Sequence, residues 1–396
     1  MKVKNGTKKV KNSEKMGDLL AEVRLWLLLA SFAALVTCKE DCPLYLAPNK
    51  YGYGRGVYAG ADTARNEYPI TTAPTLLVNN NHLYATSLNN YVFQSEDENY
   101  NMVVFGPSQL MNHLSSIAIT EHYWDVDNIS TASESTVEPY SSYSTISWKT
   151  TTNISVGEEI TTTYGDQEWF SSRGIHDTSD ALYQNNKNDS GNGSGYLLDE
   201  LKESGFCLSD VYISPSTIPL AGKGVFASRN FDIGEIVSIS PVVLMSKDKL
   251  VPTLEDSVLV NYCFAHPDSD IFILPLHLTA LINHNYLSNV NISWYENKKW
   301  KEAMGTAHIA IDTTPVEYIV DQSFAALDIQ YVATKPIQKN EEIYINYGDV
   351  WINNWAEYLA RRIQAHLHDQ SPTFRYPIYV EGLYPPHWKL PHEVEA

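Results

Sequence analysis

Two copies of one nine-residue string constrain the fold of this 396-residue chain more than any other feature. Residues Glu341–Asp349 read Glu-Glu-Ile-Tyr-Ile-Asn-Tyr-Gly-Asp, and residues Glu158–Asp166 read Glu-Glu-Ile-Thr-Thr-Thr-Tyr-Gly-Asp. The sequence of each copy predicts a half-buried strand that ends at a Gly-Asp turn. Both copies share Glu-Glu-Ile and place a tyrosine, Tyr347 or Tyr164, just before the glycine. They therefore indicate an internal repeat.

Further blocks recur in the same order ahead of each copy, which chance does not produce. A Gly-basic-Gly turn runs into a strand, a glutamate and a Pro-led apolar strand follow, then an Asn-Tyr pair and an Asn-His pair. The main paired blocks are Gly54–Ala59 with Gly222–Ala227, Asn90–Phe93 with Asn261–Phe264, and Gln109–His113 with Ala280–His284. Few stretches have a 3.6-residue period, so the sequence predicts a mainly β fold with short helices.

The repeat divides the chain into two tandem domains joined by a flexible linker. We expect a first unit at residues 39–170, a linker at 171–204 and a second unit at 205–350. The linker assignment follows from the Asn-, Gly- and Ser-rich composition of Tyr183–Gly195. Residues 351–396 are expected to be a helix followed by a tail rich in proline and aromatic residues. Within the first unit, the Ser/Thr-rich stretch Ser130–Thr163 predicts an exposed insertion.

The N-terminal residues 1–38 are lysine-rich and end in the uncharged run Leu25–Val36. This pattern predicts a signal peptide or signal anchor, with no stable membrane span unless the signal stays uncleaved. An organelle transit signal and a chance buried helix are the alternatives. The first prediction places the protein in the secretory pathway or outside the cell, with an organelle lumen or the cytoplasm as alternatives. Six sequons give weak support for a glycoprotein: Asn5, Asn128, Asn153, Asn188, Asn192 and Asn291.

Charge and cysteine content exclude some functions. The formal net charge of −19 argues against nucleic-acid binding, which needs a basic face, and favours a basic partner. The four cysteines form no Cys-x-x-Cys pair, so we expect no structural zinc and no other metal site. Three or four thiols also do not make a disulfide framework.

The ordered motifs of the second unit resemble the SET-domain family of protein-lysine methyltransferases, and those of the first unit resemble it more faintly. Asn283–Val290 is similar to the family string Asn-His-Ser-Cys-x-Pro-Asn-Val, with Asn285, Tyr286 and Ser288 as departures. The segment that leads into the second nonapeptide also resembles the corresponding segment of the family, with Asn340 where glycine is common. The resemblance implies two tandem SET-like β-clip domains, of which the first is degenerate.

The resemblance also implies a site for S-adenosylmethionine. Gly222, Lys223 and Gly224 would line the methionine end of this cofactor, because a Gly-x-Gly turn lets the backbone approach a ligand closely. Asn283 would hydrogen-bond the cofactor's amino group, and the backbone of His284 would hold its adenine. Tyr347 would be catalytic, with its hydroxyl in the channel for the substrate lysine. Positioning supplies much of the acceleration in such an in-line transfer.

Each of these motifs alone has a simpler interpretation: a plain turn, a capping asparagine or a half-buried strand tyrosine. Their joint order favours an enzyme that methylates lysine side chains of a basic protein. No cysteine follows Cys263, so the Cys-rich zinc knot of histone-directed members is missing and a non-histone substrate is expected. Asn346 stands where many members have aspartate. The alternative is an inactive SET-like scaffold or binding protein of the endomembrane or extracellular space.

Overall fold

The computed structural model describes fifteen stretches of the chain. They are residues 42–49, 54–80, 86–94, 100–114, 120–124, 144–165, 167–172, 195–219, 221–247, 258–266, 269–305, 309, 314–320, 325 and 327–353. The predicted N-terminal signal, most of the predicted linker and the tail beyond residue 353 lie outside these stretches. The described residues, from Cys42 to residue 353, lie in one compact body. Among the described residues, no helix is long and apolar enough to cross a membrane.

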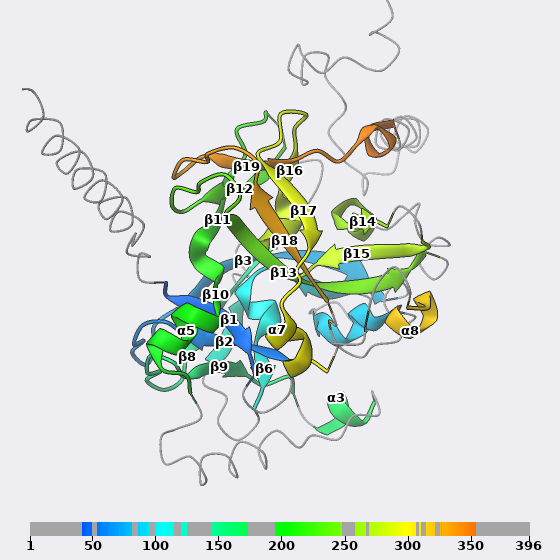
Figure 1. Ribbon diagram of the computed structural model, residues 1–396. Helices are drawn as coiled ribbons and strands as arrows, with labels where there is room; N and C mark the ends of the chain where they lie inside the picture. Colours follow the sequence, from blue (N-terminus) through cyan, green and yellow to red (C-terminus); the bar gives the residue numbers. More distant parts are fainter. Residues whose placement is uncertain are drawn as a thin grey trace, which may run out of the picture. The chain divides into compact units, whose positions relative to one another are not determined.

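Nine strands of the first unit form two sheets, one of which is joined by β10 (Figure 1). The smaller sheet has the order β10-β1-β2-β9-β6 and the larger has the order β4-β5-β3-β8-β7. The strands are β1 (Leu44–Pro48), β2 (Arg55–Ala59), β3 (Ile70–Asn79), β4 (Val92–Gln94), β5 (Tyr100–Val104), β6 (Asn112–His113), β7 (Thr120–Trp124), β8 (Ser144–Thr150), β9 (Glu159–Thr162) and β10 (Phe206–Cys207).

The second unit has the same strand order, β11-β12-β19-β16 in one sheet and β14-β15-β13-β18-β17 in the other. Its strands are β11 (Val211–Pro215), β12 (Lys223–Ala227), β13 (Ile236–Ser246), β14 (Phe264–Ala265), β15 (Ile271–Pro275), β16 (Asn283–His284), β17 (Val290–Trp294), β18 (Leu327–Ala333) and β19 (Glu342–Ile345). The mainly β prediction is confirmed. The recurring sequence blocks occupy matching strands in both units.

Helices are short and lie between the strands. The α-helices are α3 (Gln167–Ser171), α5 (Leu198–Ser204), α7 (Lys298–Ala303) and α8 (Val316–Val320). The 3-10 helices are η2 (Ser87–Tyr91), η3 (Pro107–Leu110), η4 (Leu208–Asp210), η6 (Val258–Tyr262) and η7 (Leu278–Leu281). Residues 349–353 are also helical.

The expected exposed insertion at Ser130–Thr163 is wrong for its second part. Residues 144–150 form β8, which pairs with both β3 and β7, and its Trp148 is fully buried. The serines and threonines there alternate with Ile146 and Trp148, and β-branched threonine suits a strand. Composition suggested an exposed segment, but the period-2 pattern decides the structure.

The glutamates that recur in the sequence cap tight turns. In each unit, two of them accept a hydrogen bond from the backbone N–H three residues earlier, at 2.8, 2.9 or 3.0 Å. These four are Glu67, Glu158, Glu235 and Glu341. Asn340 occupies the last of these turns with φ of +67°, where Gly157 of the first unit has +83°. Glycine is common at this position because few other residues adopt a left-handed conformation, and asparagine is one of them.

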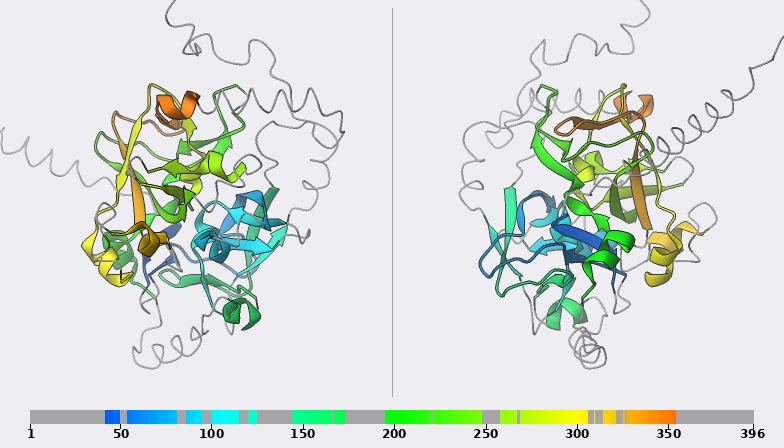
Figure 2. Two further views of the ribbon diagram at one scale, coloured as in Figure 1. Left: turned by 90° about the vertical axis from the view of Figure 1, so that its right-hand side faces the viewer. Right: turned by 60° about the vertical axis from the view of Figure 1, so that its left-hand side comes forward.

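One hydrophobic core runs through both units. The blue-to-teal ribbons of the first unit lie next to the green-to-orange ribbons of the second (Figure 2). A single buried cluster includes Val57 and Trp148 of the first unit with Val225 and Ile343 of the second. The backbone N–H of Gly106 also donates to Leu276 O at 3.0 Å, and the Trp300 indole N–H of α7 donates to Ser204 O at 3.1 Å. Neither unit is therefore expected to fold independently of the other.

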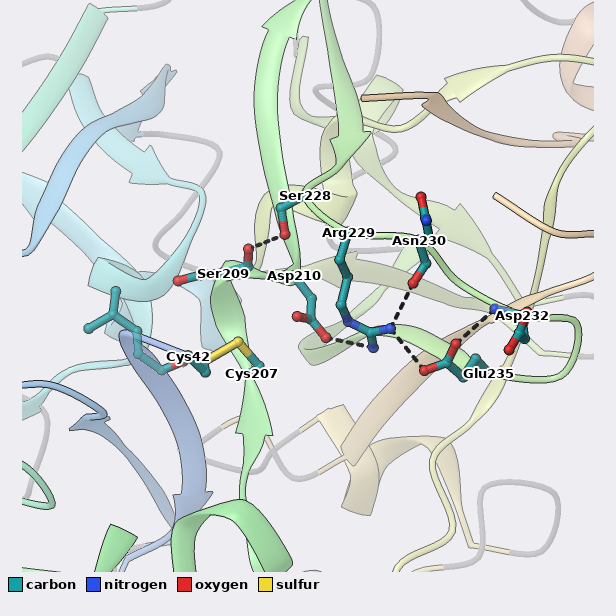
Figure 3. A network of polar contacts seen from close by, with 10 residues as sticks. Cys42, Cys207, Ser209, Asp210, Ser228, Arg229, Asn230, Asp232 and Glu235 are labelled. Atoms are coloured by element: carbon teal, nitrogen blue, oxygen red, sulfur yellow. Dashed lines mark hydrogen bonds and ion pairs between the residues drawn. A yellow bond between two sulfur atoms is a disulfide. The ribbon is translucent and has the colours of Figure 1, made fainter. Parts of the chain in front are cut away.

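A disulfide joins Cys42, before β1, to Cys207 of β10, and both cysteines are buried (Figure 3). Cys263 is a free, buried thiol. The Arg229 guanidinium forms ion pairs with the carboxylates of Asp210, at 3.0 Å, and Glu235, at 2.9 Å. These two ion pairs, drawn in Figure 3, connect the start of β11 to the turn before β13. Sequence reasoning found neither the disulfide pairing nor these ion pairs.

Candidate active site

The four-stranded sheet of the second unit brings the predicted site residues together. Its inner strand β19 pairs antiparallel with β12 on one side and parallel with β16 on the other (Figure 1). The Gly-Lys-Gly turn leads into β12, and β16 consists of Asn283 and His284. Tyr347 follows the end of β19 by two residues. Blocks far apart in the sequence thus meet because they occupy adjacent strands.

The amide of Asn283 is held at its nitrogen end. Its Nδ2 donates to Lys223 O at 2.9 Å, to Glu342 Oε1 at 3.1 Å and to Ser216 Oγ at 3.1 Å. No residue of the described stretches hydrogen-bonds its Oδ1. The side chain is half-buried, so this oxygen is the atom that a ligand could reach.

Glu342 is the polar centre of the sheet, and sequence reasoning missed it. Its carboxylate is 3% exposed and accepts hydrogen bonds from five donors. They are the Ser216 hydroxyl at 2.7 Å, the Thr217 backbone N–H and hydroxyl at 2.6 Å each, the Tyr344 hydroxyl at 2.8 Å and the Asn283 amide at 3.1 Å. Burial raises its pKa, but these hydrogen bonds outweigh burial and leave the pKa below its ordinary value. The repeated Glu-Glu pair was the available signal.

The two glycines of the turn have different reasons to be glycine. Gly222 has φ of +70°, a left-handed conformation. A Cβ on Gly224 would lie 2.2 Å from Glu342 Oε1, so a side chain there would displace the carboxylate. The second glycine thus makes room for the Glu342 carboxylate, and the contact of Gly224 with a cofactor stays a prediction.

Tyr347 is fixed at both its backbone and its hydroxyl. The backbone N–H donates to His284 Nδ1 at 3.0 Å, and the hydroxyl donates to Ile282 O at 2.5 Å. His284 Nδ1 accepts this hydrogen bond, so that nitrogen carries no proton. The ring is therefore neutral in this arrangement. Burial lowers the pKa of His284 below its ordinary value, against an opposing effect of Asp349, which agrees with a neutral ring.

Aromatic rings surround this tyrosine. The ring of Trp351 lies edge-on at 4.5 Å from Tyr347, and that of His284 lies at 5.4 Å. Tyr286, 54% exposed, stands edge-on to His284 at 4.9 Å. The predicted aromatic tail lies outside the described stretches, and Trp351 is the aromatic residue after Tyr347 whose contact with the tyrosine is described.

Two asparagines near Tyr347 have structural roles. Asn289 is 1% exposed. Its side-chain amide bonds the backbone of β19 as a neighbouring strand would: Nδ2 donates to Glu342 O at 2.9 Å, and Oδ1 accepts from Tyr344 N at 2.7 Å. Asn346 Oδ1 accepts from the backbone N–H of Gly348 at 2.9 Å. An aspartate could accept the same bond, so the departure at Asn346 leaves the turn intact.

The first unit keeps the frame of this site. Asn112 Nδ2 donates to Arg55 O at 3.0 Å and to Glu159 Oε1 at 2.7 Å. The Tyr164 backbone N–H donates to His113 Nδ1 at 2.9 Å, and its hydroxyl donates to Met111 O at 2.7 Å. These contacts therefore recur in both units, and the degeneracy of the first unit stays a prediction.

The Gly-x-Gly turn is where the units differ. Arg55 is 9% exposed and reaches into the second unit, where it pairs with Asp328 of β18 at 2.9 Å. The corresponding Lys223 is half-exposed. Met304, which follows α7, lies 3.7 Å from where a Cβ on Gly54 would be. The first turn thus serves contacts between the units.

Glu159, the counterpart of Glu342, has fewer donors in the described stretches: Asn49 at 2.9 Å to each oxygen and Asn112 at 2.7 Å. Burial outweighs these bonds and raises its pKa to about 7. Above pH 4.5, the ordinary pKa of the carboxyl, Glu159 loses its proton in the unfolded chain but keeps it in the folded protein. The stability that this proton contributes is fully present below pH 4.5 and is lost as the pH rises through about 7.

Glu159→Gln copies the protonated carboxyl and cannot lose a proton. We therefore expect the variant to gain stability over the wild type as the pH rises, by roughly 2–3 kcal/mol between about pH 5 and pH 8. Urea unfolding at both pH values measures this difference. Glu342→Gln should be less stable than the wild type at both pH values. A pH-independent effect of Glu159→Gln would contradict the raised pKa.

The described stretches contain no group of His, Cys, Asp and Glu side chains that could hold a metal ion. Among curated proteins, none matches the chain. A family model described as the SET domain matches residues 222–348. The matched range runs from the Gly-Lys-Gly turn to the glycine after Tyr347.

Several solved structures are similar over about a third of the chain. A candidate histone methyltransferase of Plasmodium falciparum is 23% identical, over 36% of this chain and 96% of that chain, with a TM-score of 0.25. The Chaetomium thermophilum polycomb repressive complex 2 is 22% identical over 35% of this chain and 15% of that chain, with a TM-score of 0.26. The match thus spans only a small part of the polycomb chain. It is the family model that identifies residues 222–348 as a SET domain, in the unit where the ordered motifs predict one.

Proposed function

We propose that the second unit is an S-adenosylmethionine-dependent methyltransferase of protein lysine side chains. One observation supports this most: the Tyr347 hydroxyl is fixed on Ile282 O, the carbonyl directly before Asn283. A hydroxyl for the substrate amine and an amide for the cofactor are therefore held close together, just after β19 and on the neighbouring β16. Fixed positions of this kind are what an in-line transfer needs.

The residues present fit the cofactor. Asn283 offers an oxygen acceptor, Oδ1, while its nitrogen is already engaged, and the amino group of S-adenosylmethionine is a donor. Gly222, Lys223 and Gly224 would lie along the methionine end, and the His284 backbone would hold the adenine. The bound cofactor would supply the methyl group as part of a sulfonium.

Tyr347 would act on the substrate side. Its hydroxyl oxygen has lone pairs beyond the bond that it donates to Ile282 O, so it can accept from a neutral lysine amine and orient it. The neighbouring ring of Trp351 would restrict how the lysine side chain lies.

Calorimetry with S-adenosylmethionine on the full chain tests the proposal. We expect one site per chain, because Arg55 and Met304 occupy the first turn. Transfer of labelled methyl groups to lysine-rich proteins should accompany binding. No heat and no thermal shift would favour the scaffold function instead.

We further propose that the substrate is a basic, non-histone protein. The net charge of −19 would attract such a partner at low salt. None of residues 264–396 is a cysteine, so this stretch supplies no Cys-rich zinc knot of the kind that histone-directed members use. Comparing labelling of lysine-rich secreted proteins and of core histones tests this; faster labelling of histones would contradict it.

An oxidising compartment is the third part of the proposal. The buried Cys42–Cys207 disulfide would persist in the secretory pathway, whereas cytosolic thiols stay reduced. Two sequon asparagines, Asn153 and Asn291, lie exposed in the described stretches. We expect the expressed full chain to lose mass on treatment with an N-glycosidase. A free-thiol count of four in denaturant and no mass change would exclude this compartment.

A further inference from the structure

The carboxylate of Glu342 and the carbonyl of Lys223 determine how the Asn283 amide is turned. Both groups lie at hydrogen-bond distance from Nδ2, at 3.1 and 2.9 Å. An ionised carboxylate and a backbone carbonyl only accept hydrogen bonds. A flipped amide would place its oxygen against two acceptors, so the nitrogen must face them and Oδ1 must face away.

Glu342 can serve as an acceptor because its surroundings keep it ionised. Ser216, Thr217 and Tyr344 all donate to it, at 2.6–2.8 Å. Together with the Asn283 amide, these donors hydrogen-bond both carboxylate oxygens of Glu342, a residue that is 3% exposed. A buried carboxylate with so many donors remains a fixed negative charge.

In the first unit, the described residues supply the same position with fewer donors, from Asn49 and Asn112. Asn49 replaces Ser216 in the strand register, and Thr161 replaces Tyr344. Glu159 consequently takes up a proton near neutral pH, and a protonated carboxyl both donates and accepts. The Asn112 amide is then opposed by only one obligate acceptor, Arg55 O. The two units thus share a frame but differ in how firmly they orient the asparagine.

We propose that Glu342 is a positioning residue that turns the Asn283 amide so that Oδ1 meets the ammonium group of an amino-acid-bearing ligand. The inference rests on the proposed function of the second unit. In this proposal, the second glutamate of the nonapeptide selects ligands that carry the α-amino group of an amino acid.

Two ligands separate this role from a general structural one. S-adenosylmethionine carries the amino acid, whereas methylthioadenosine keeps the adenosine and the sulfur but lacks the amino-acid chain and therefore the α-amino group. Binding of both is measured by calorimetry on the full-length wild type, Glu342→Gln and the matched control Glu159→Gln. Glu342→Gln should weaken S-adenosylmethionine roughly 10- to 100-fold, as expected when a charged group's hydrogen bonds are lost, and leave methylthioadenosine within about twofold. Glu159→Gln should change neither.

Ser216→Ala provides a milder test if Glu342→Gln does not fold. This hydroxyl touches both Glu342 Oε1 and Asn283 Nδ2, and it lies in a half-buried loop position. We expect a loss of about three- to tenfold for S-adenosylmethionine alone. Equal weakening of both ligands, or unchanged affinity in Glu342→Gln, would overturn the positioning role. A wild type that binds neither ligand would instead overturn the proposed function, and this inference with it.

Discussion

Asp328→Ala is expected to lower the free energy of unfolding by about 3–5 kcal/mol, because it leaves the Arg55 guanidinium buried without its charge partner. Arg55 and Asp328 are 9% and 4% exposed, and Nε donates to Oδ1 at 3.0 Å. Arg55 also donates to Ala325 O at 3.0 Å. Burial raises the pKa of Asp328 in spite of Arg55, so the pair is held at a desolvation cost. Urea unfolding measures the loss.

The double variant Arg55→Met with Asp328→Leu is the matched control. Replacing both charges by apolar groups of similar size removes the desolvation cost together with the attraction, so most of the stability should return. Glu302→Ala, which breaks the exposed pair with Lys298, should change stability little. If the double variant were as unstable as Asp328→Ala, the loss would come from packing and not from the unpaired charge.

Tyr347→Phe is expected to slow methyl transfer to lysine by on the order of 10²–10³-fold, because it removes only the hydroxyl that would orient the amine. The ring contacts with His284 and Trp351 remain, so folding should be preserved. Single-turnover transfer of a labelled methyl group measures the rate. Binding of S-adenosylmethionine should be unchanged, which separates the substrate side from the cofactor side.

Tyr164→Phe is the internal control for that experiment. Its hydroxyl donates to Met111 O as that of Tyr347 does to Ile282 O, so the two substitutions remove equivalent bonds. Only the change in the second unit should affect transfer. Equal rates in Tyr347→Phe and wild type would refute the role of this tyrosine, and equal slowing in both variants would point to a general loss of packing.

The sequence sufficed for the strand pattern and for the group of site residues. Recurring blocks in a constant order mark recurring strands, and the SET family model covers the stretch where the second set of blocks lies. Asn283 and Tyr347 could be singled out because each belongs to a string of several residues. Their contacts, through β16 and β19, follow once those strands pair in parallel.

Other features depend on long-range partners that no local pattern specifies. Arg55 looks like an ordinary basic residue of a Gly-x-Gly turn, and only the fold shows that its partner is 273 residues away. The Gly-x-Gly pattern does not reveal that Gly224 also makes room for the Glu342 carboxylate. Ser144–Thr150 was judged by composition, although its alternation marks a core strand. Periodicity was the better guide there, because burial of alternate side chains stabilises a strand whatever the polar residues between them.

The Cys42–Cys207 bond closes a covalent ring that contains the whole first unit, since 165 positions separate its two cysteines. A protease that cuts the chain once within this ring opens it without releasing a fragment. The cut protein should migrate as two pieces only after reduction. Because the shared core also joins the pieces, a nicked molecule would persist as a two-chain protein with its Tyr347 site still assembled.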